Sequence, residues 1–203
     1  MSDTPAIPQP PARLILEVGF DVDQQSDQLS YRLLPDPLFP PEPDPNPRRG
    51  GYANALYFKA GEQVTVQVVG GGDKVDKTPG FVSFQIVDCT IITKPQVVRR
   101  DKGVRTEYAP PSPFSQALSA SYPLALDFST HVTVDDEKYF ELTQNWKQTL
   151  DVAYSPGLWE LSMVLTVRII RGVGEVDEVR VFSFDPEAEV GGQGTMPQDP
   201  GCA

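Results

Sequence analysis

The chain has 203 residues, enough for one domain of ordinary size whose core needs neither a metal nor a disulfide. Its formal net charge of −11 argues against nucleic acid as a main partner, because phosphate binding requires clustered lysine and arginine side chains. No apolar stretch approaches the length needed to span a bilayer, so we expect no membrane partner.

Residues 1–11 are rich in proline and contain neither a basic region nor an apolar run. We therefore expect a disordered arm rather than a signal peptide, and a cytoplasmic protein. The two cysteines fit this location. Cys89 falls in an apolar strand and Cys202 in a tail rich in glycine and proline, which argues against a structural disulfide.

A single domain is expected over residues 12–187, and it begins with a strand at residues 13–23. The buried face of this strand is predicted from alternate apolar residues, namely Leu14, Leu16, Val18, Phe20 and Val22. The residues between them, Glu17, Gly19 and Asp21, are expected on the opposite face. Residues 31–34 continue or pair with this strand. Residues 35–47 contain seven prolines and predict a stiff polyproline II excursion across the surface.

The middle of the chain predicts three further strands, at residues 53–59, 63–69 and 81–93. A tight turn at Gly61 separates the first two, and the glycine-rich residues 70–80 predict a flexible loop. The third strand is expected to bulge near Asp88. Residues 94–112 form a polar connection, and Ser112 is expected to cap a short helix that extends to about Ser121.

The last third predicts strands at residues 126–134, 139–152, 158–170 and 178–184, with a break in the second of them near Gln144. The strand at 158–170 is the clearest of all. Its apolar face alternates over eleven residues, comprising Trp159, Leu161, Met163, Leu165, Val167 and Ile169. The remaining residues, 188–203, are expected to form a disordered tail.

Seven to nine strands with no alternation of strands and helices indicate an all-β fold. We expect an antiparallel β-sandwich, jelly-roll or immunoglobulin-like, with one short helix and long proline-rich loops. Closure into a barrel is the structural alternative. The sequence does not specify the order of the strands.

The chain offers little catalytic or metal-binding chemistry, and we expect no cofactor. His131 is the only histidine and is expected to be an exposed strand residue, because no Gly-x-Ser-x-Gly motif supplies the serine of a triad. The three acidic residues Asp135, Asp136 and Glu137 can supply oxygen ligands to calcium, but they lack the alternating spacing that wraps a cation. A hairpin turn is the preferred interpretation.

Two groups of residues are candidate binding surfaces. Trp146, flanked by Asn145 and Lys147, has the side chains that stack on and hydrogen-bond a sugar, although its spacing also places it in the core. The basic cluster in the polar connection can bind an acidic partner or a second copy of this acidic chain; it comprises Arg99, Arg100, Lys102 and Arg105. The alternative for this cluster is a charged solvent loop.

Several segments together resemble the AidA/PixA-type inclusion-body proteins of bacteria. These segments are Leu14–Val18, the proline-rich stretch, Leu56–Gly61 leading into Val64–Val68, Phe81–Val87, and Val181–Glu187. The chain departs from the methionine-rich members in having only three methionines, and it has an expanded region at 94–125. The resemblance implies a jelly-roll-like sandwich that accumulates or self-associates inside the cell. It implies no catalytic residues.

We therefore predict a non-enzymatic, cytoplasmic protein that forms a homo-oligomer. The alternatives are a carbohydrate- or other ligand-binding module and, third, a hydrolase with carboxylates in a groove. The position of Trp146 separates the first two. A solvent-facing Trp146 favours sugar binding, whereas a buried Trp146 with an exposed apolar patch or an unpaired edge strand elsewhere favours assembly.

Overall fold

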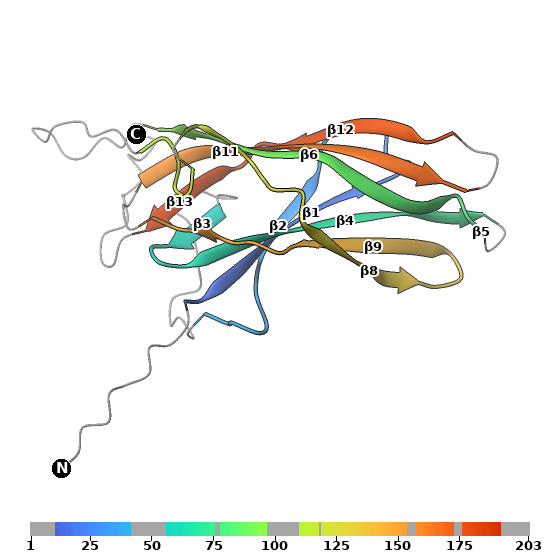
Figure 1. Cartoon of the computed structure of the whole chain (residues 1–203), viewed down its shortest axis with the longest axis horizontal. Coiled ribbons are helices and arrows are strands. Elements are labelled where there is room, and N and C mark those ends of the chain that lie inside the picture. The colour runs from blue at the N-terminus through green and yellow to red at the C-terminus, as the bar shows by residue number, and fades with distance from the viewer. Residues whose placement is uncertain are drawn as a thin grey trace, which may run out of the picture.

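A computed structural model describes residues 11–41, 56–75, 78–96, 110–117, 119–153, 157–172 and 176–191. These residues form thirteen β-strands and no helix, arranged as two sheets that lie face to face (Figure 1). The all-β class predicted from the sequence is confirmed.

The first sheet, called sheet A, has the strand order β2-β1-β4-β9-β8. Its strands are β1 (Arg13–Asp21), β2 (Ser30–Pro35), β4 (Gln63–Val75), β8 (Phe128–Asp135) and β9 (Tyr139–Trp146). Two short strands, β5 (Thr78–Pro79) and β10 (Leu150–Asp151), also pair with β4.

The second sheet, called sheet B, has the order β3-β13-β11-β6-β7, and β12 also pairs with β11. Its strands are β3 (Leu56–Lys59), β6 (Phe81–Pro95), β7 (Ser121–Pro123), β11 (Gly157–Arg171), β12 (Glu178–Phe184) and β13 (Glu187–Gly191). The strands β12 and β13 lie end to end along one edge of β11 in a single register. Pro186 separates them because it has no N–H to donate to the ladder.

The core fills the space between the two sheets. The six alternating residues predicted for the buried face of β11 are all 0% exposed, so this prediction is confirmed. Phe20 of β1 reaches across to sheet B, where its ring lies 5.2 Å from that of Phe84 and 4.9 Å from that of Phe182 (centroid distances). Side chains from both sheets thus share one hydrophobic cluster.

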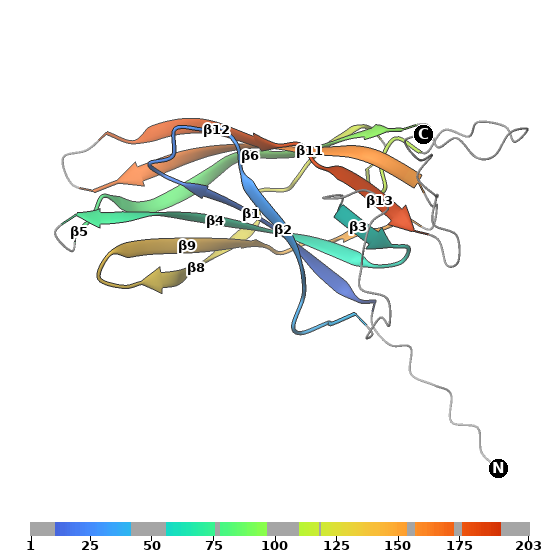
Figure 2. The same cartoon turned by 180° about the vertical axis from the view of Figure 1, so that it is seen from behind.

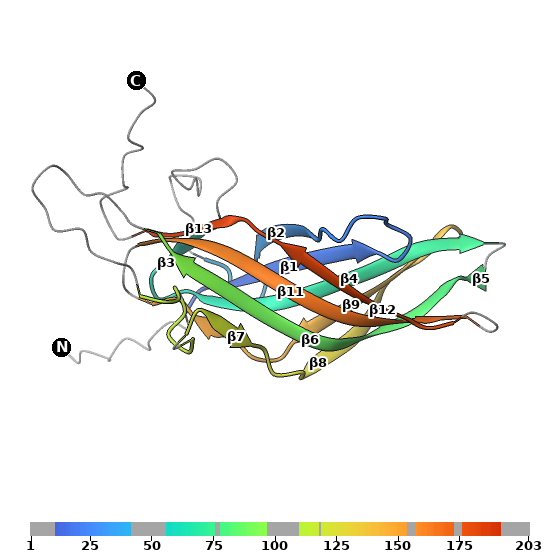
Figure 3. The ribbon, with the colours of Figure 1, turned by 90° about the horizontal axis from the view of Figure 1, so that it is seen from above.

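The prediction of purely antiparallel pairing is wrong in two places. Strand β1 pairs with β4 in parallel from Arg13↔Gln63 to Asp21↔Gly71, and β13 pairs with β3 in parallel. Parallel neighbours need a long connection between them, and both pairs are far apart in the sequence. Seen from above, β1 and β4 run side by side beneath the strands of sheet B (Figure 3).

The short helix predicted from Ser112 is also wrong, since residues 110–117 and 119–121 contain no helix. The Ser112 hydroxyl accepts a hydrogen bond from the Phe114 N–H (3.2 Å) in a local turn. The backbone then pairs across to the β10 segment, with the Ser115 N–H donating to the Asp151 carbonyl (2.9 Å). Burial of Phe114, which is 2% exposed, stabilises this extended path over a helical one.

Three predicted boundaries change in the structure. Gly70–Gly72 lie inside β4 and do not form a loop. The ordered chain continues past residue 187 into β13, whereas a tail had been predicted from residue 188. The break predicted near Gln144 falls instead between β9 and β10, at residues 147–149. The bulge predicted near Asp88 is confirmed by a register shift in the β6–β11 pairing.

The connection between β1 and β2 covers the outer edge of β12 (Figure 2). The Leu29 N–H donates to the Ser183 carbonyl, and the Ser183 N–H donates to the Asp27 carbonyl, both at 2.8 Å. The Arg180 guanidinium donates to the carbonyls of Val22 (3.2 Å) and Gln24 (2.7 Å). These contacts bridge sheet A to sheet B on this side of the molecule.

Candidate functional site

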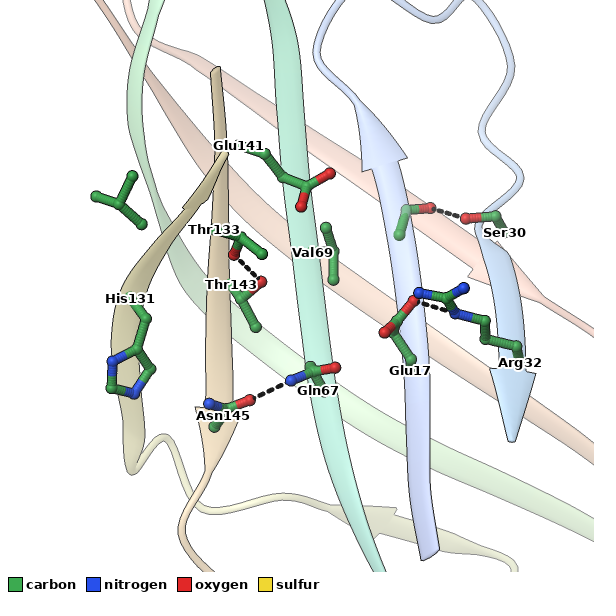
Figure 4. Close-up of a pocket in the computed structure, with 12 residues that line it drawn as sticks. Glu17, Ser30, Arg32, Gln67, Val69, His131, Thr133, Glu141, Thr143 and Asn145 are labelled. Atoms are coloured by element: carbon green, nitrogen blue, oxygen red, sulfur yellow. Dashed lines mark hydrogen bonds and ion pairs between the residues drawn. The ribbon is translucent and has the colours of Figure 1, made fainter. Parts of the chain in front are cut away.

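The outer face of sheet A, turned away from the core, carries an open polar groove with a volume of about 450 Å³ (Figure 4). Its lining comes from five strands: Glu17, Gly19, Ser30, Arg32, Gln67, Val69, His131, Val132, Thr133, Glu141, Thr143 and Asn145. Most of these residues alternate with buried residues of the same strands, as the period of two in a β-strand requires.

Small residues, Gly19 and Ser30, face one another across β1 and β2 where these strands line the groove. Gly19 pairs with Ser30, and the Ser30 hydroxyl donates to the Gly19 carbonyl (3.1 Å). A Cβ atom at Gly19 would meet the Ser30 hydroxyl oxygen at 2.8 Å, closer than the two atoms can pack. The backbone of β1 therefore forms part of the groove floor.

A row of polar side chains crosses the groove in register. Arg32, Glu17, Gln67 and Asn145 occupy paired positions on β2, β1, β4 and β9. The Arg32 Nε donates to Glu17 Oε1 at 2.5 Å, and the Gln67 Nε2 donates to Asn145 Oδ1 at 2.6 Å. Cross-strand bonds of this kind hold the side chains in fixed orientations.

Glu141 projects from β9 into the same groove (Figure 4). Partial burial raises the pKa of its carboxyl group above the ordinary value, and the nearby Glu17 carboxylate raises it further. The Arg32 guanidinium acts in the opposite direction. Among the described residues, no donor hydrogen-bonds the Glu141 carboxylate, so the protein itself does little to compensate its charge.

We expect the Glu141→Gln variant to be more stable than the wild type at pH 7. Because the pKa of Glu141 is raised by folding, the folded state binds this proton more tightly than the unfolded chain does. In the wild type, the stability that the protonated Glu141 contributes is fully present below the unfolded-state pKa and is lost as the pH rises through the folded-state pKa. Thermal unfolding over a pH series checks this: the gain in melting temperature should shrink as the pH falls through the raised pKa of Glu141 and should be gone below the ordinary glutamate pKa. A variant less stable than the wild type at pH 7 would contradict it.

His131 and Thr133 of β8 form one side of the groove, next to Thr143 of β9. The hydroxyls of Thr133 and Thr143 hydrogen-bond each other across β8 and β9. His131 is exposed, as predicted. Figure 4 shows its ring on the outer strand, apart from the Glu17–Arg32 pair on the opposite side.

Comparison of the chain with protein-family models, with curated proteins and with solved structures finds no match. The likeness to AidA/PixA-type proteins therefore stays a prediction from the segments named above. No helix among the described residues is both long and apolar enough to cross a membrane.

The structure separates the three residues predicted to bind sugar. Trp146 is only 4% exposed, and its Nε1 donates to the Ala125 carbonyl (2.8 Å). It offers no ring face to a sugar, so this part of the carbohydrate prediction is wrong. Lys147 forms an exposed ion pair with Asp127 (2.7 Å). Asn145 alone lies in the groove, on the opposite face of β9 from Trp146.

The acidic run at residues 135–137 joins β8 to β9, as the hairpin prediction required. Asp136 Oδ1 accepts the backbone N–H groups of Lys138 (2.8 Å) and Tyr139 (2.7 Å), and these bonds lower the pKa of its carboxyl. The Lys74 ammonium pairs with Asp135. Within the described part of the chain, no group of three or more His, Cys, Asp or Glu residues is arranged to hold a metal ion.

Cys89 is a buried free thiol, as expected, and burial raises its pKa to about 12. The thiolate that would react or bind metal is therefore scarce at neutral pH. The remaining candidates fall outside the described residues: Cys202 and the basic cluster of Arg99, Arg100, Lys102 and Arg105.

Arg32, Gln67 and Glu141 were not predicted from the sequence to share a surface. The sequence did place Glu17 on the outer face of its strand, and the same alternation was available for Gln67 and Glu141. The sequence does not specify the order of the strands, and it is this order that brings the three positions to one surface.

Sheet A ends at β8, and the outer edge of β8 pairs with no other described strand. The strand is eight residues long, and its middle reads Ser-Thr-His-Val-Thr-Val with neither lysine nor proline. Val132 at its centre is 61% exposed. A register shift between Val132 and Val134 is the one local feature that interrupts the edge.

Proposed function

We propose that this protein is a non-enzymatic β-sandwich that self-associates through the outer edge of β8. The observation that carries the proposal is an eight-residue edge that pairs with no strand in the described part of the chain and has an exposed valine at its centre. Such an edge presents a row of free N–H and C=O groups to the edge of a second chain. Two β8 strands meeting in antiparallel fashion would form a closed, two-fold symmetric dimer.

The other outer strands carry the features that block edge pairing. The edge of β2 contains Arg32 and ends at Pro35, while β3 and β7 have only four and three residues. The edge of β12 is covered near Ser183 by the β1–β2 connection. Charged residues, proline, short length, coverage and bulges are the means by which sheets avoid pairing. Strand β8 is eight residues long, has no proline and pairs with no described strand along its outer edge. Its one acidic residue, Asp135, is the last of the strand, and a bulge between Val132 and Val134 is the only such device near its centre.

The buried Trp146 also favours assembly over sugar stacking, because a buried indole was the observation that distinguished the two alternatives. The resemblance to AidA/PixA-type proteins points in the same direction. It supports a jelly-roll-like protein that accumulates in the bacterial cytoplasm.

Hydrolysis by carboxylates in the groove has less support than either self-association or ligand binding. Glycoside hydrolysis of the two-carboxylate type needs one carboxyl as acid and the other as base or nucleophile. Glu17 is bonded to Arg32, which leaves Glu141 as the only groove carboxylate without a hydrogen-bond donor among the described residues.

The Val132→Lys variant is expected to weaken self-association by about tenfold or more, equivalent to about 1.4 kcal/mol. A lysine on the edge brings two like charges together in a symmetric strand pair. Light scattering behind size exclusion, over a hundredfold range of concentration, measures the change. The matched control is Val181→Lys, an equally exposed valine (56%) on the outer face of sheet B, which should associate like the wild type.

The same measurement at two salt concentrations separates β8 from the basic cluster. Copies with a charge of −11 repel one another, so screening should leave β8 pairing unchanged or strengthen it. Association through Arg99, Arg100, Lys102 and Arg105 should instead weaken with salt. A wild-type protein that is monomeric throughout, or a V132K variant that associates normally, would reject the β8 interface.

A further inference from the structure

The groove on sheet A presents several polar atoms that the described residues leave without a partner. The amide bond between Gln67 and Asn145 uses Gln67 Nε2 and Asn145 Oδ1, which leaves Gln67 Oε1 as an acceptor and Asn145 Nδ2 as a donor. Glu141 adds two carboxylate oxygens with no donor among the described residues. Along β9, Glu141 lies at one end of the groove and the Gln67–Asn145 pair at the other, with the Thr133–Thr143 pair between them (Figure 4).

The negative charge of the groove favours cationic ligands over anionic ones. Arg32 is bonded to Glu17 and offsets the Glu141 charge only partly, so the two carboxylates and one guanidinium leave the lining with a net negative charge. The chain as a whole carries −11, so its field also attracts cations and repels anions. A partly desolvated carboxylate gains most from a ligand that brings a positive charge and hydrogen-bond donors.

The size and rigidity of the groove limit that ligand to a small molecule. A volume of about 450 Å³ falls within the range of small-ligand sites. Six of its polar side chains are held in pairs by cross-strand hydrogen bonds before any ligand arrives, whereas Glu141 has no such bond to a described residue. Among the described residues that line the groove, none is a phenylalanine, tyrosine or tryptophan, and the only ring is the His131 imidazole on the outer strand. The groove therefore lacks the large aromatic face on which sugars usually stack.

We propose that this groove binds a small ligand that carries a primary ammonium group beside hydroxyl groups, the chemistry of an amino sugar. The ammonium group would pair with the Glu141 carboxylate. The neighbouring hydroxyls would donate to Gln67 Oε1 and accept from Asn145 Nδ2. This site is distinct from the β8 interface, although His131, Val132 and Thr133 of β8 contribute to its rim.

Binding should depend on pH through Glu141, because only the ionised carboxylate attracts the ammonium group. Burial and the Glu17 charge raise the pKa of Glu141, so affinity should fall with decreasing pH sooner than for an ordinary glutamate. Several other charged or titratable groups face or influence Glu141: Glu17, Arg32, His131 and Tyr139.

Calorimetric titration with glucosamine and with glucose tests the proposal, because the two sugars differ only in the amine. At a pH where the glucosamine amine is protonated, we expect glucosamine to bind the wild type and glucose to bind at least about tenfold more weakly. The Glu141→Gln variant should lose about tenfold or more in glucosamine affinity and should lose the pH dependence. It keeps the shape of the side chain and is expected to be well folded.

The control is Glu160→Gln, which removes the same charge from an ion pair with Lys94 on sheet B. It should bind glucosamine like the wild type. Equal affinity for glucose and glucosamine would mean that the ammonium group is not recognised and would overturn the proposal. So would the absence of glucosamine binding at millimolar concentration, or equal losses in E141Q and E160Q.

Discussion

Replacing Trp146 with alanine is expected to lower the free energy of unfolding by about 3–5 kcal/mol, the usual cost of deleting a large buried aromatic side chain. The indole is 4% exposed and packs into the hydrophobic cluster at the end of β9. Its Nε1 also donates to the Ala125 carbonyl at 2.8 Å. Denaturant unfolding followed by the fluorescence of Trp159, the other tryptophan, measures the loss.

The Trp146→Phe variant separates packing from hydrogen bonding. Phenylalanine keeps much of the buried ring but removes the N–H donor. Ala125 is exposed, so its carbonyl can bond to water instead, and we expect this variant to lose no more than about 1.5 kcal/mol. A W146A protein as stable as the wild type would show that the indole is not buried, and would restore sugar stacking as an interpretation.

The burial of Trp146 could be predicted because apolar residues recur at every second position on the buried face of a strand. Phe140, Leu142, Trp146, Leu150 and Val152 have one parity in the sequence, and the structure puts the β9 members of this set on the inner face of sheet A. The same alternation predicted all six core residues of β11. Alternation predicts which face of its own strand a residue occupies, but it does not predict which strands are neighbours.

The groove could not be predicted, because it depends on which strands are neighbours. Gln67 and Asn145 are 78 residues apart, and the parallel pairing of β1 with β4 brings Glu17 beside them. Parallel pairing between distant strands leaves no local signal. The polar character of each position was visible, but the row that they form was not.

The helix prediction failed for a related reason. Ser112 followed by Pro113 is a good local start for a helix, but Phe114 is buried and its segment pairs with the chain near Asp151. A local preference of a few tenths of a kcal/mol per residue is outweighed by burial of one aromatic side chain at about 1.5–3 kcal/mol.

The loop predicted from the glycine composition of residues 70–72 is instead a strand, in which the absence of side chains makes room for neighbouring groups. These glycines lie within β4, and the inward position of Gly70 is filled by rings from both sheets. Glycine in a strand often marks a close approach of another group, and here that group is aromatic.

Substituting alanine for Gly70 is therefore expected to destabilise the protein by about 1–3 kcal/mol, the usual cost of overpacking a core. A Cβ atom there would lie 2.7 Å from Phe20 Cζ and 2.9 Å from Phe84 Cδ1, far inside contact distance. Both rings are buried, at 5% and 2% exposure, and cannot swing into solvent to make room. The shift in denaturant midpoint measures the cost, provided that the slope of the transition is unchanged.

Gly80→Ala is the matched control, because it makes the same chemical change where a Cβ atom meets no heavy atom within 4 Å. Gly80 also lies outside the left-handed region that Gly61 occupies with a φ of 85°, so alanine adds no backbone strain there. We expect its stability to stay within about 0.5 kcal/mol of the wild type. If G70A and G80A behave alike, the rings do not close over Gly70, and residues 70–72 are the loop that their composition predicts.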